Sequence, residues 1–254
     1  MPWKQWQPGD PITINRVVWD GLESEFIQDV LDRDWFGPGK YAAEFEKQLA
    51  EYVGTSHAQL TNSGSSALLL GCQALQQLGI WQKGDLILHP ACTFPTSCNP
   101  IWQSGMIPVF VDVEEGTYNL DLDKVVDTFV QYGDRIKGAI VPHLIGNSPQ
   151  IDAIVELFEI FISNYGLIED CCDTLGSEYD GQKVGTFGHV ACQSFYGSHH
   201  ITTAGVGGAL LTDNQDIARL AKSMAFWGRQ FVNTGDPYYD FTQRYTYETI
   251  GYDM

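Results

Sequence analysis

Apolar runs alternate with amphipathic stretches along most of the chain. Short apolar segments predict β-strands at residues 85–90, 107–113, 138–144, 165–170, 191–196 and 208–213. Longer amphipathic stretches predict helices at 41–53, 64–78, 96–104, 121–132 and 149–163. Near-continuous apolar strands separated by helices indicate a mainly parallel sheet that helices cover on both faces. The pattern therefore predicts an α/β domain.

Polar and aromatic residues follow four of the predicted strands. They are His89 to Phe94, His143 to Asn147, Glu169-Asp170 and Ser194 to His200. In parallel sheets of this kind, ligands bind at the carboxyl ends of the strands. We therefore expect these four groups to meet in one crevice.

The charge balance excludes one class of partner. Fourteen basic and 32 acidic residues give a formal net charge of −18, which would repel a phosphate backbone. We expect no nucleic-acid partner. The sequence has neither a long apolar run nor a basic segment followed by an apolar one at its start, so we predict a cytoplasmic protein without a membrane span.

The cysteines give no sign of a metal site. None of them forms a CxxC pair, and the Cys171-Cys172 neighbours lack zinc-type spacing. We interpret all six as small buried apolar residues, namely Cys72, Cys92, Cys98, Cys171, Cys172 and Cys192.

Three sequence features are candidates for ligand binding or catalysis, and each could instead have only a structural role. Gly64, Ser65 and Ser66 begin an apolar helix, where they could bind an anion or only cap the helix. Phe94 could present a flat face to a cofactor or pack in the core. Asp170 could cap a turn or hold a protonated ring nitrogen.

The pair His199-His200 lies where a strand gives way to a glycine-rich loop. Paired histidines on a loop are usually polar surface. They can also replace a residue of another kind, because an imidazole moves protons near neutral pH.

An ordered set of strings resembles one family from about residue 12 to the end. They are "SGSSAL" (63–68), "TFPTSCNP" (93–100), "VPHLIGN" (141–147), "LIEDCCDTLGS" (167–177), "GTFG" (185–188) and "SFYGSHHITTAGVGG" (194–208). Together they are similar to the DegT/DnrJ/StrS sugar aminotransferases, which have the type I pyridoxal-phosphate fold.

The resemblance implies a domain plan. An N-terminal arm and first helix (1–40) would precede a cofactor-binding large domain (41–232). Residues 233–254 would lead towards a small C-terminal domain of about 100 residues, an ordinary domain size. We therefore expect a truncated chain that pairs as a homodimer.

The resemblance also implies roles for single residues. Ser65, Ser66 and Ser194, beside Gly64, resemble the cofactor phosphate contacts. Phe94 resembles the residue stacked on the pyridine ring, and Asp170 the carboxylate paired with its nitrogen. Further candidates, for substrate contact or for support of these groups, are His143, Asn147, Asp173 and His200.

His199 falls where the family's transaminases carry their Schiff-base lysine. A histidine there, within "HHI", resembles the nucleotide-sugar 3-dehydratases. The implied reaction uses pyridoxamine 5′-phosphate, held without a covalent bond, and a CDP- or GDP-linked 4-keto-6-deoxyhexose. His199 would take a proton from the C4′ carbon of the cofactor, and the C3 hydroxyl of the sugar would leave.

Three departures from the family pattern qualify this expectation. No cysteine follows "WGR" (227–229), so we expect no iron–sulfur cluster, and glutamate or a separate reductase would complete the cycle. Gly205-Val206-Gly207-Gly208 stands in place of "GEGG". Asp253 stands where an asparagine would reach the partner subunit's phosphate, and a carboxylate is unfavourable there.

Two alternatives remain open. The chain could be a pyridoxal-phosphate-dependent nucleotide-sugar aminotransferase that recruits another lysine, of which Lys183 is nearest in sequence. It could also be a truncated, catalytically silent chain that binds the cofactor.

Overall fold

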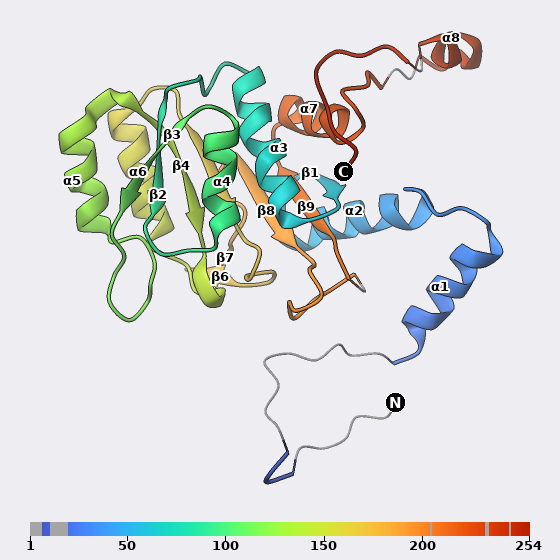
Figure 1. The fold of residues 1–254 in the computed structure, drawn as a ribbon, viewed down its shortest axis with the longest axis horizontal. Helices are drawn as coiled ribbons and strands as arrows, with labels where there is room; N and C mark the ends of the chain where they lie inside the picture. The colour runs from blue at the N-terminus through green and yellow to red at the C-terminus, as the bar shows by residue number, and fades with distance from the viewer. Residues whose placement is uncertain (1–6, 11–19, 204, 232–233, 244) are drawn as a thin grey trace.

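A seven-stranded sheet forms the centre of the molecule (Figure 1). The computed structural model describes residues 7–10, 20–203, 205–231, 234–243 and 245–254. The strand order is β1-β9-β8-β5-β4-β2-β3. The strands are β1 (His57–Thr61), β2 (Leu86–Pro90), β3 (Ile107–Val111), β4 (Ile136–Pro142), β5 (Gly166–Asp170), β8 (Val190–Ser194) and β9 (Gly208–Thr212). Strand β9 pairs antiparallel with β1 and β8, whereas β5 pairs in parallel with β8 and β4, as β2 does with β4 and β3.

Helices cover both faces of this sheet. These are α2 (Lys40–Val53), α3 (Gly64–Gln77), α4 (Pro95–Gln103), α5 (Leu122–Tyr132), α6 (Ile151–Phe161) and α7 (Gln215–Ala225). Helices α1 (Leu22–Asp32) and α8 (Pro237–Thr242) lie away from the sheet (Figure 1). Helices α3, α4 and α7 pack on one face, and α2, α5 and α6 pack on the other. A separate small hairpin joins β6 (Glu178–Tyr179) to β7 (Gln182–Lys183).

Alternate residues of each strand supply the two core layers. In β5, Leu167 packs with the α5 and α6 layer, and Ile168 packs with the α3 layer. The buried ring of Trp81 fits against Gly138 and Gly166, where an added Cβ would lie within 2.6 Å of the indole nitrogen. Its Nε1 donates a hydrogen bond to the carbonyl oxygen of Lys137 at 2.9 Å. Two glycines therefore make room for the largest fully buried side chain.

The predicted α/β architecture is confirmed. All six predicted strands and five predicted helices form, with ends that move by a few residues. The predicted strand 191–196 stops at Ser194, where the chain turns into the His199 loop. Strand β1 and helix α7 were not predicted. The domain limits at residues 40 and 232 stay predictions.

The interpretation of the cysteines is partly wrong. Cys72, Cys171 and Cys192 are buried, but Cys92 is exposed. Cys98 and Cys172 are only half-buried, and Cys172 lines a cavity. No helix within the described residues is long and apolar enough to cross a membrane.

Candidate active site

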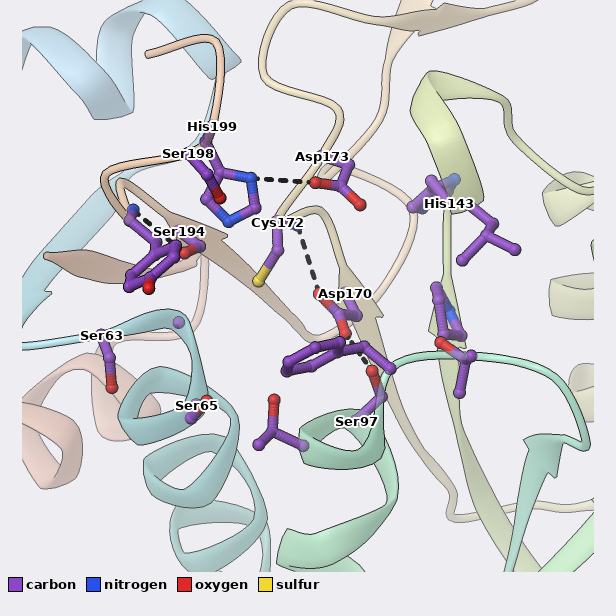
Figure 2. Close-up of a pocket in the computed structure, with 17 residues that line it drawn as sticks. Ser63, Ser65, Ser97, His143, Asp170, Cys172, Asp173, Ser194, Ser198 and His199 are labelled. Atoms are coloured by element: carbon purple, nitrogen blue, oxygen red, sulfur yellow. Dashed lines mark hydrogen bonds and ion pairs between the residues drawn. The ribbon is translucent and has the colours of Figure 1, made fainter. Parts of the chain in front are cut away.

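A cavity of about 550 Å³ opens at the carboxyl ends of the central strands (Figure 2). All four predicted groups contribute to its lining, so the expected convergence is confirmed. The predicted residues that line it are Gly64, Ser65, Phe94, His143, Asp170, Asp173, Ser194 and His199. Ser66, Asn147 and His200 are not among its lining residues. Residues that sequence reasoning did not single out include Ser63, Ser97 and Cys172.

The first turn of α3 forms one wall and offers an anion site. Ser63 caps the helix, and its Oγ accepts a hydrogen bond from the Ser66 amide at 3.1 Å. The amides of Gly64 and Ser65 have no partner inside the helix, as at any helix start. A Cβ on Gly64 would lie 2.6 Å from Cys172 Sγ and 2.8 Å from Ser194 Cβ. Glycine therefore lets this helix start approach β8 closely.

Ser66 lies on the far side of that turn. Its hydroxyl donates to Asn62 Oδ1 at 2.6 Å, and it lines a separate small groove between α3 and α4. This arrangement argues against a direct contact between the Ser66 hydroxyl and a ligand in the main cavity. His200 and Asn147 are exposed, so their predicted roles also find no support in the lining.

Asp170 ends β5 and points into the cavity from the opposite side. It is 8% exposed. Ser97 Oγ donates to its Oδ2 at 2.5 Å, and the Cys172 amide donates to its Oδ1 at 3.2 Å. Two donors hold the carboxylate, and its remaining lone pairs can accept from a protonated ring nitrogen.

Phe94 stands at the start of α4, next to this carboxylate. It is the N-terminal cap residue of the helix, and Pro95 follows as the first helical residue, a position that suits proline. The ring is 68% exposed, so it is not a core residue. It presents a free flat face to the cavity.

His199 and Asp173 face each other from two different loops (Figure 2). His199 Nδ1 lies 3.0 Å from Asp173 Oδ1. The backbone amide of His199 donates to the Tyr196 carbonyl oxygen at 2.9 Å, which fixes a tight turn after β8. The Asp173 carboxylate contacts Nδ1 and so orients the imidazole in the loop that lines the cavity.

Glu169 is a structural carboxylate behind the cavity rather than part of it. Its oxygens accept hydrogen bonds from the amides of Gly185, Phe187 and Gly188 at 2.6–2.7 Å. Its Oε2 also lies 2.9 Å from His143 Nε2. The "GTFG" loop therefore supplies backbone donors to a fully buried carboxylate. His143, held in this way, lines the cavity on its other edge.

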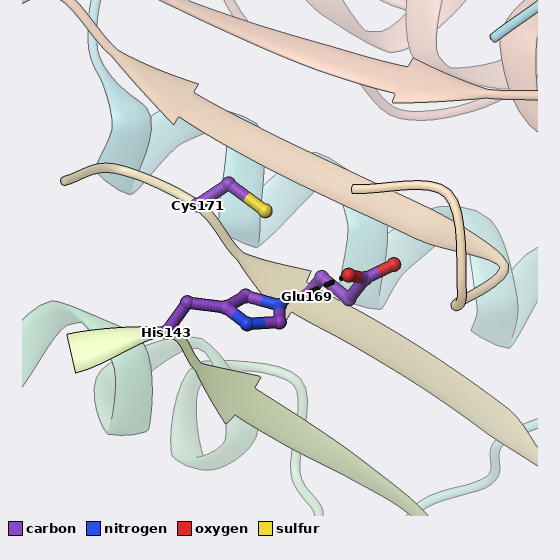
Figure 3. Close-up of side chains that lie close together, drawn as sticks. All are labelled: His143, Glu169 and Cys171. Carbon is purple, nitrogen blue, oxygen red and sulfur yellow. Dashed lines mark hydrogen bonds and ion pairs between the residues drawn. The ribbon is translucent and has the colours of Figure 1, made fainter. Parts of the chain in front are cut away.

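His143, Glu169 and Cys171 form the one cluster of possible metal ligands among the described residues (Figure 3). Both carboxylate oxygens of Glu169 already accept hydrogen bonds. Burial raises the pKa of the Cys171 thiol well above its ordinary value, whereas metal binding requires the thiolate. We interpret the cluster as a hydrogen-bonded core.

None of the described lysines lines the cavity. Lys183, the nearest in sequence to the histidine loop, lies on β7, with its Nζ 3.8 Å from Glu178 Oε1 and 4.3 Å from the centre of the Tyr52 ring. Asp253 also lies outside the lining and pairs with Phe226 in an isolated β-bridge.

Comparisons with known proteins agree with this geometry. A model of the DegT/DnrJ/EryC1/StrS aminotransferase family matches residues 20–254. A lipopolysaccharide biosynthesis protein of Salmonella typhimurium is 36% identical over 87% of the chain and 53% of its own length. A dTDP-4-dehydro-2,6-dideoxy-D-glucose 3-dehydratase of Saccharopolyspora spinosa is 36% identical over 85% of the chain and 50% of its own length.

Aminotransferase-type relatives are almost as similar. A GDP-perosamine synthase of Caulobacter vibrioides is 34% identical over 92% of the chain and 58% of its own length. Among solved structures, the Escherichia coli GDP-4-keto-6-deoxy-D-mannose-3-dehydratase with bound hydrated PLP superposes with a TM-score of 0.85 and is 29% identical in sequence. The match covers 94% of this chain and 62% of the length of that structure. The chain spans about half the length of the curated relatives it matches.

Proposed function

Because the chain belongs to the DegT/DnrJ/EryC1/StrS aminotransferase family, we propose that its cavity binds pyridoxal or pyridoxamine 5′-phosphate and carries out C3 dehydration of a nucleotide-linked 4-keto-6-deoxyhexose. Pyridoxal phosphate is the cofactor of this family. The observation that carries the dehydratase proposal is the position of His199 in a cavity to which no described lysine contributes.

The residues of the cavity fit a phosphorylated pyridine. The amides of Gly64 and Ser65, with the Ser194 hydroxyl, offer donors for the phosphate at a helix start. Asp170, across the cavity, offers a carboxylate for a protonated ring nitrogen, and the exposed ring of Phe94 offers a stacking face. An anion site, a carboxylate and a flat apolar face thus lie around one cavity.

His199 would move the proton at the C4′ carbon of the cofactor. When bound, pyridoxamine phosphate supplies an amino group that condenses with the keto group of the sugar and a ring that accepts electrons. Asp173 orients the imidazole through its contact with Nδ1. The hydroxyl that leaves C3 would depart as water, with the proton supplied by the imidazolium of His199.

Histidine in place of lysine favours elimination. An imidazole has no primary amine, so His199 cannot hold the cofactor covalently, whereas it can act as a general base. No cysteine follows Cys192 in the sequence, so we propose that the cycle runs without an iron–sulfur cluster on this chain and that glutamate restores the amino form.

The substrate class rests on the relatives. Their printed substrates are GDP- and dTDP-linked sugars, and one relative is a lipopolysaccharide biosynthesis protein. We propose a nucleotide-linked 4-keto-6-deoxyhexose, in 3,6-dideoxysugar biosynthesis, and a homodimer as the working form.

Transamination is the second candidate, since a GDP-perosamine synthase is 34% identical to the chain. In that case the product would gain an amino group and retain its C3 hydroxyl. Incubation with pyridoxamine phosphate and CDP-, GDP- or dTDP-linked 4-keto-6-deoxyhexoses, followed by product mass and NMR, distinguishes the two. The proposal predicts a sugar that has lost its C3 oxygen. An amino sugar as the product would contradict it. Cofactor binding with no turnover of any substrate would favour the silent-chain alternative.

A further inference from the structure

Ser97 makes the shortest hydrogen bond of the cavity. It lies in the first turn of α4, it is 1% exposed, and its Oγ donates to Asp170 Oδ2 at 2.5 Å (Figure 2). The second hydrogen bond to that carboxylate comes from the backbone amide of Cys172, which donates to Oδ1 at 3.2 Å. A buried hydroxyl bonded to a carboxylate oxygen at this distance is a strong, directional restraint.

The same helical turn holds the stacking ring. Phe94 caps α4, and the Ser97 amide donates to the Phe94 carbonyl oxygen at 3.1 Å. One turn therefore carries the aromatic face and the hydroxyl that restrains the carboxylate. This bond links the turn that carries Phe94 to Asp170, a residue 76 positions further along the chain.

The first turn of α4 also suits a negative charge. The amides at a helix start carry partial positive charge, and Ser97 brings Asp170 against that turn. The Ser97 hydroxyl therefore holds the carboxylate and the helix start together.

We infer that Ser97 is a positioning residue, whose hydroxyl holds the Asp170 carboxylate in the orientation that binds the cofactor's ring nitrogen. This inference rests on the proposed function, in which Asp170 is the partner of that nitrogen. Ser97 itself touches the carboxylate and acts through it.

A double-mutant cycle on cofactor binding tests the inference. The dissociation constant of pyridoxamine 5′-phosphate would be measured by titration calorimetry for wild type, Ser97→Ala, Asp170→Asn and the double variant. Ser97→Ala is expected to raise it about tenfold, the weight of one charge-assisted hydrogen bond. In the Asp170→Asn background, the same change should have little further effect, because the charged acceptor is already gone.

Two further variants separate the hydroxyl from the volume of the side chain. Ser97→Thr keeps the donor and should bind the cofactor nearly as wild type does. Ser97→Cys keeps the volume but is a weak donor, so it should behave like Ser97→Ala. The near-ultraviolet absorbance of the bound cofactor, which depends on protonation of the ring nitrogen, should change in Ser97→Ala and Ser97→Cys alone.

The outcomes distinguish this inference from the proposed function. If wild type binds and Ser97→Ala binds equally well, the positioning role is wrong and the proposed function stands. An equal loss with and without Asp170 would mean that Ser97 only stabilises the fold. If wild type binds no pyridoxamine phosphate at all, both the inference and the proposed function fail.

Discussion

The imidazole of His199 and the carboxylate of Asp173 lie 3.0 Å apart, measured between Nδ1 and Oδ1. They come from the loops that follow β8 and β5, two neighbouring parallel strands. The Asp173 carboxylate contacts the imidazole at Nδ1 and so fixes the orientation of the ring. In the proposed reaction His199 is the proton-transfer group of the cavity, whose lining includes no lysine among the residues that the structure describes.

Replacement of His199 by asparagine tests the base directly. Asn keeps a polar side chain but cannot move a proton near neutral pH. We expect dehydration to fall about a thousandfold, the usual weight of a general base, while the affinity for pyridoxamine phosphate stays unchanged. Rates would be measured by product formation and affinity by calorimetry. His57→Asn, on β1 and away from the cavity, serves as the control, and its rate should equal that of wild type. A His199→Asn variant with undiminished turnover would exclude the role.

Replacement of Asp173 separates orientation from charge. Asp173→Ala removes the partner of His199, and we expect the dehydration rate to fall about tenfold or more with little change in cofactor affinity. Asp173→Asn keeps an oxygen acceptor at the same place and should retain more activity than the alanine variant. The comparison requires rate constants under saturating substrate. Equal rates for wild type and Asp173→Ala would show that the contact does not matter for catalysis.

Glu169 should matter for stability. Glu169→Gln replaces one carboxylate oxygen by an NH₂ group, which cannot accept a hydrogen bond. Depending on which oxygen is replaced, either the amide of Gly185 or the amides of Phe187 and Gly188 would lose their acceptor. We expect the free energy of unfolding to fall by about 3 kcal/mol, as when a buried charged network loses a member. Urea unfolding gives this value. Glu178→Gln, whose partner Lys183 is at the surface, should change it by less than about 0.5 kcal/mol. Similar values for both variants would contradict the buried role.

His89 should make the protein sensitive to acid. Burial lowers the pKa of this histidine to about 4, whereas the unfolded chain has the ordinary value near 6.5. Between these values the unfolded state binds more protons than the folded state, so stability falls as the pH falls from 6.5 towards 4.

From pH 7 to pH 5 this difference costs about 2 kcal/mol. His89→Gln, which does not titrate, should lose that much less stability over the same range. Urea unfolding of both proteins at the two pH values measures the difference. Equal pH dependence for wild type and His89→Gln would refute it.

Most strands of the central sheet were predictable because they are buried and therefore mostly apolar, as in β2, β4, β5 and β9. Strand β1 was missed because its sequence, "HAQLT", includes the polar residues Gln59 and Thr61, both of which are buried. Helix α7 is strongly amphipathic and carries a capping Asn214 that accepts hydrogen bonds from two amides. That cap was a usable sequence sign.

The candidate site was partly predictable because parallel strands bring their carboxyl ends together. That rule placed Asp170, His143 and His199 correctly. It could not indicate the bond between Ser97 and Asp170, since contacts across 73 residues depend on how α4 packs. Likewise, the role of Glu169 depends on the loop 185–188, which only the fold brings to it.

The most direct test of the account asks how the chain holds its cofactor. The protein would be incubated with one equivalent of pyridoxal 5′-phosphate, reduced with borohydride, and analysed by intact mass and peptide mapping. The account predicts no site-specific covalent adduct, together with saturable binding of pyridoxamine phosphate that Asp170→Asn weakens. A stoichiometric adduct on one lysine would contradict it and would identify the chain as an aminotransferase.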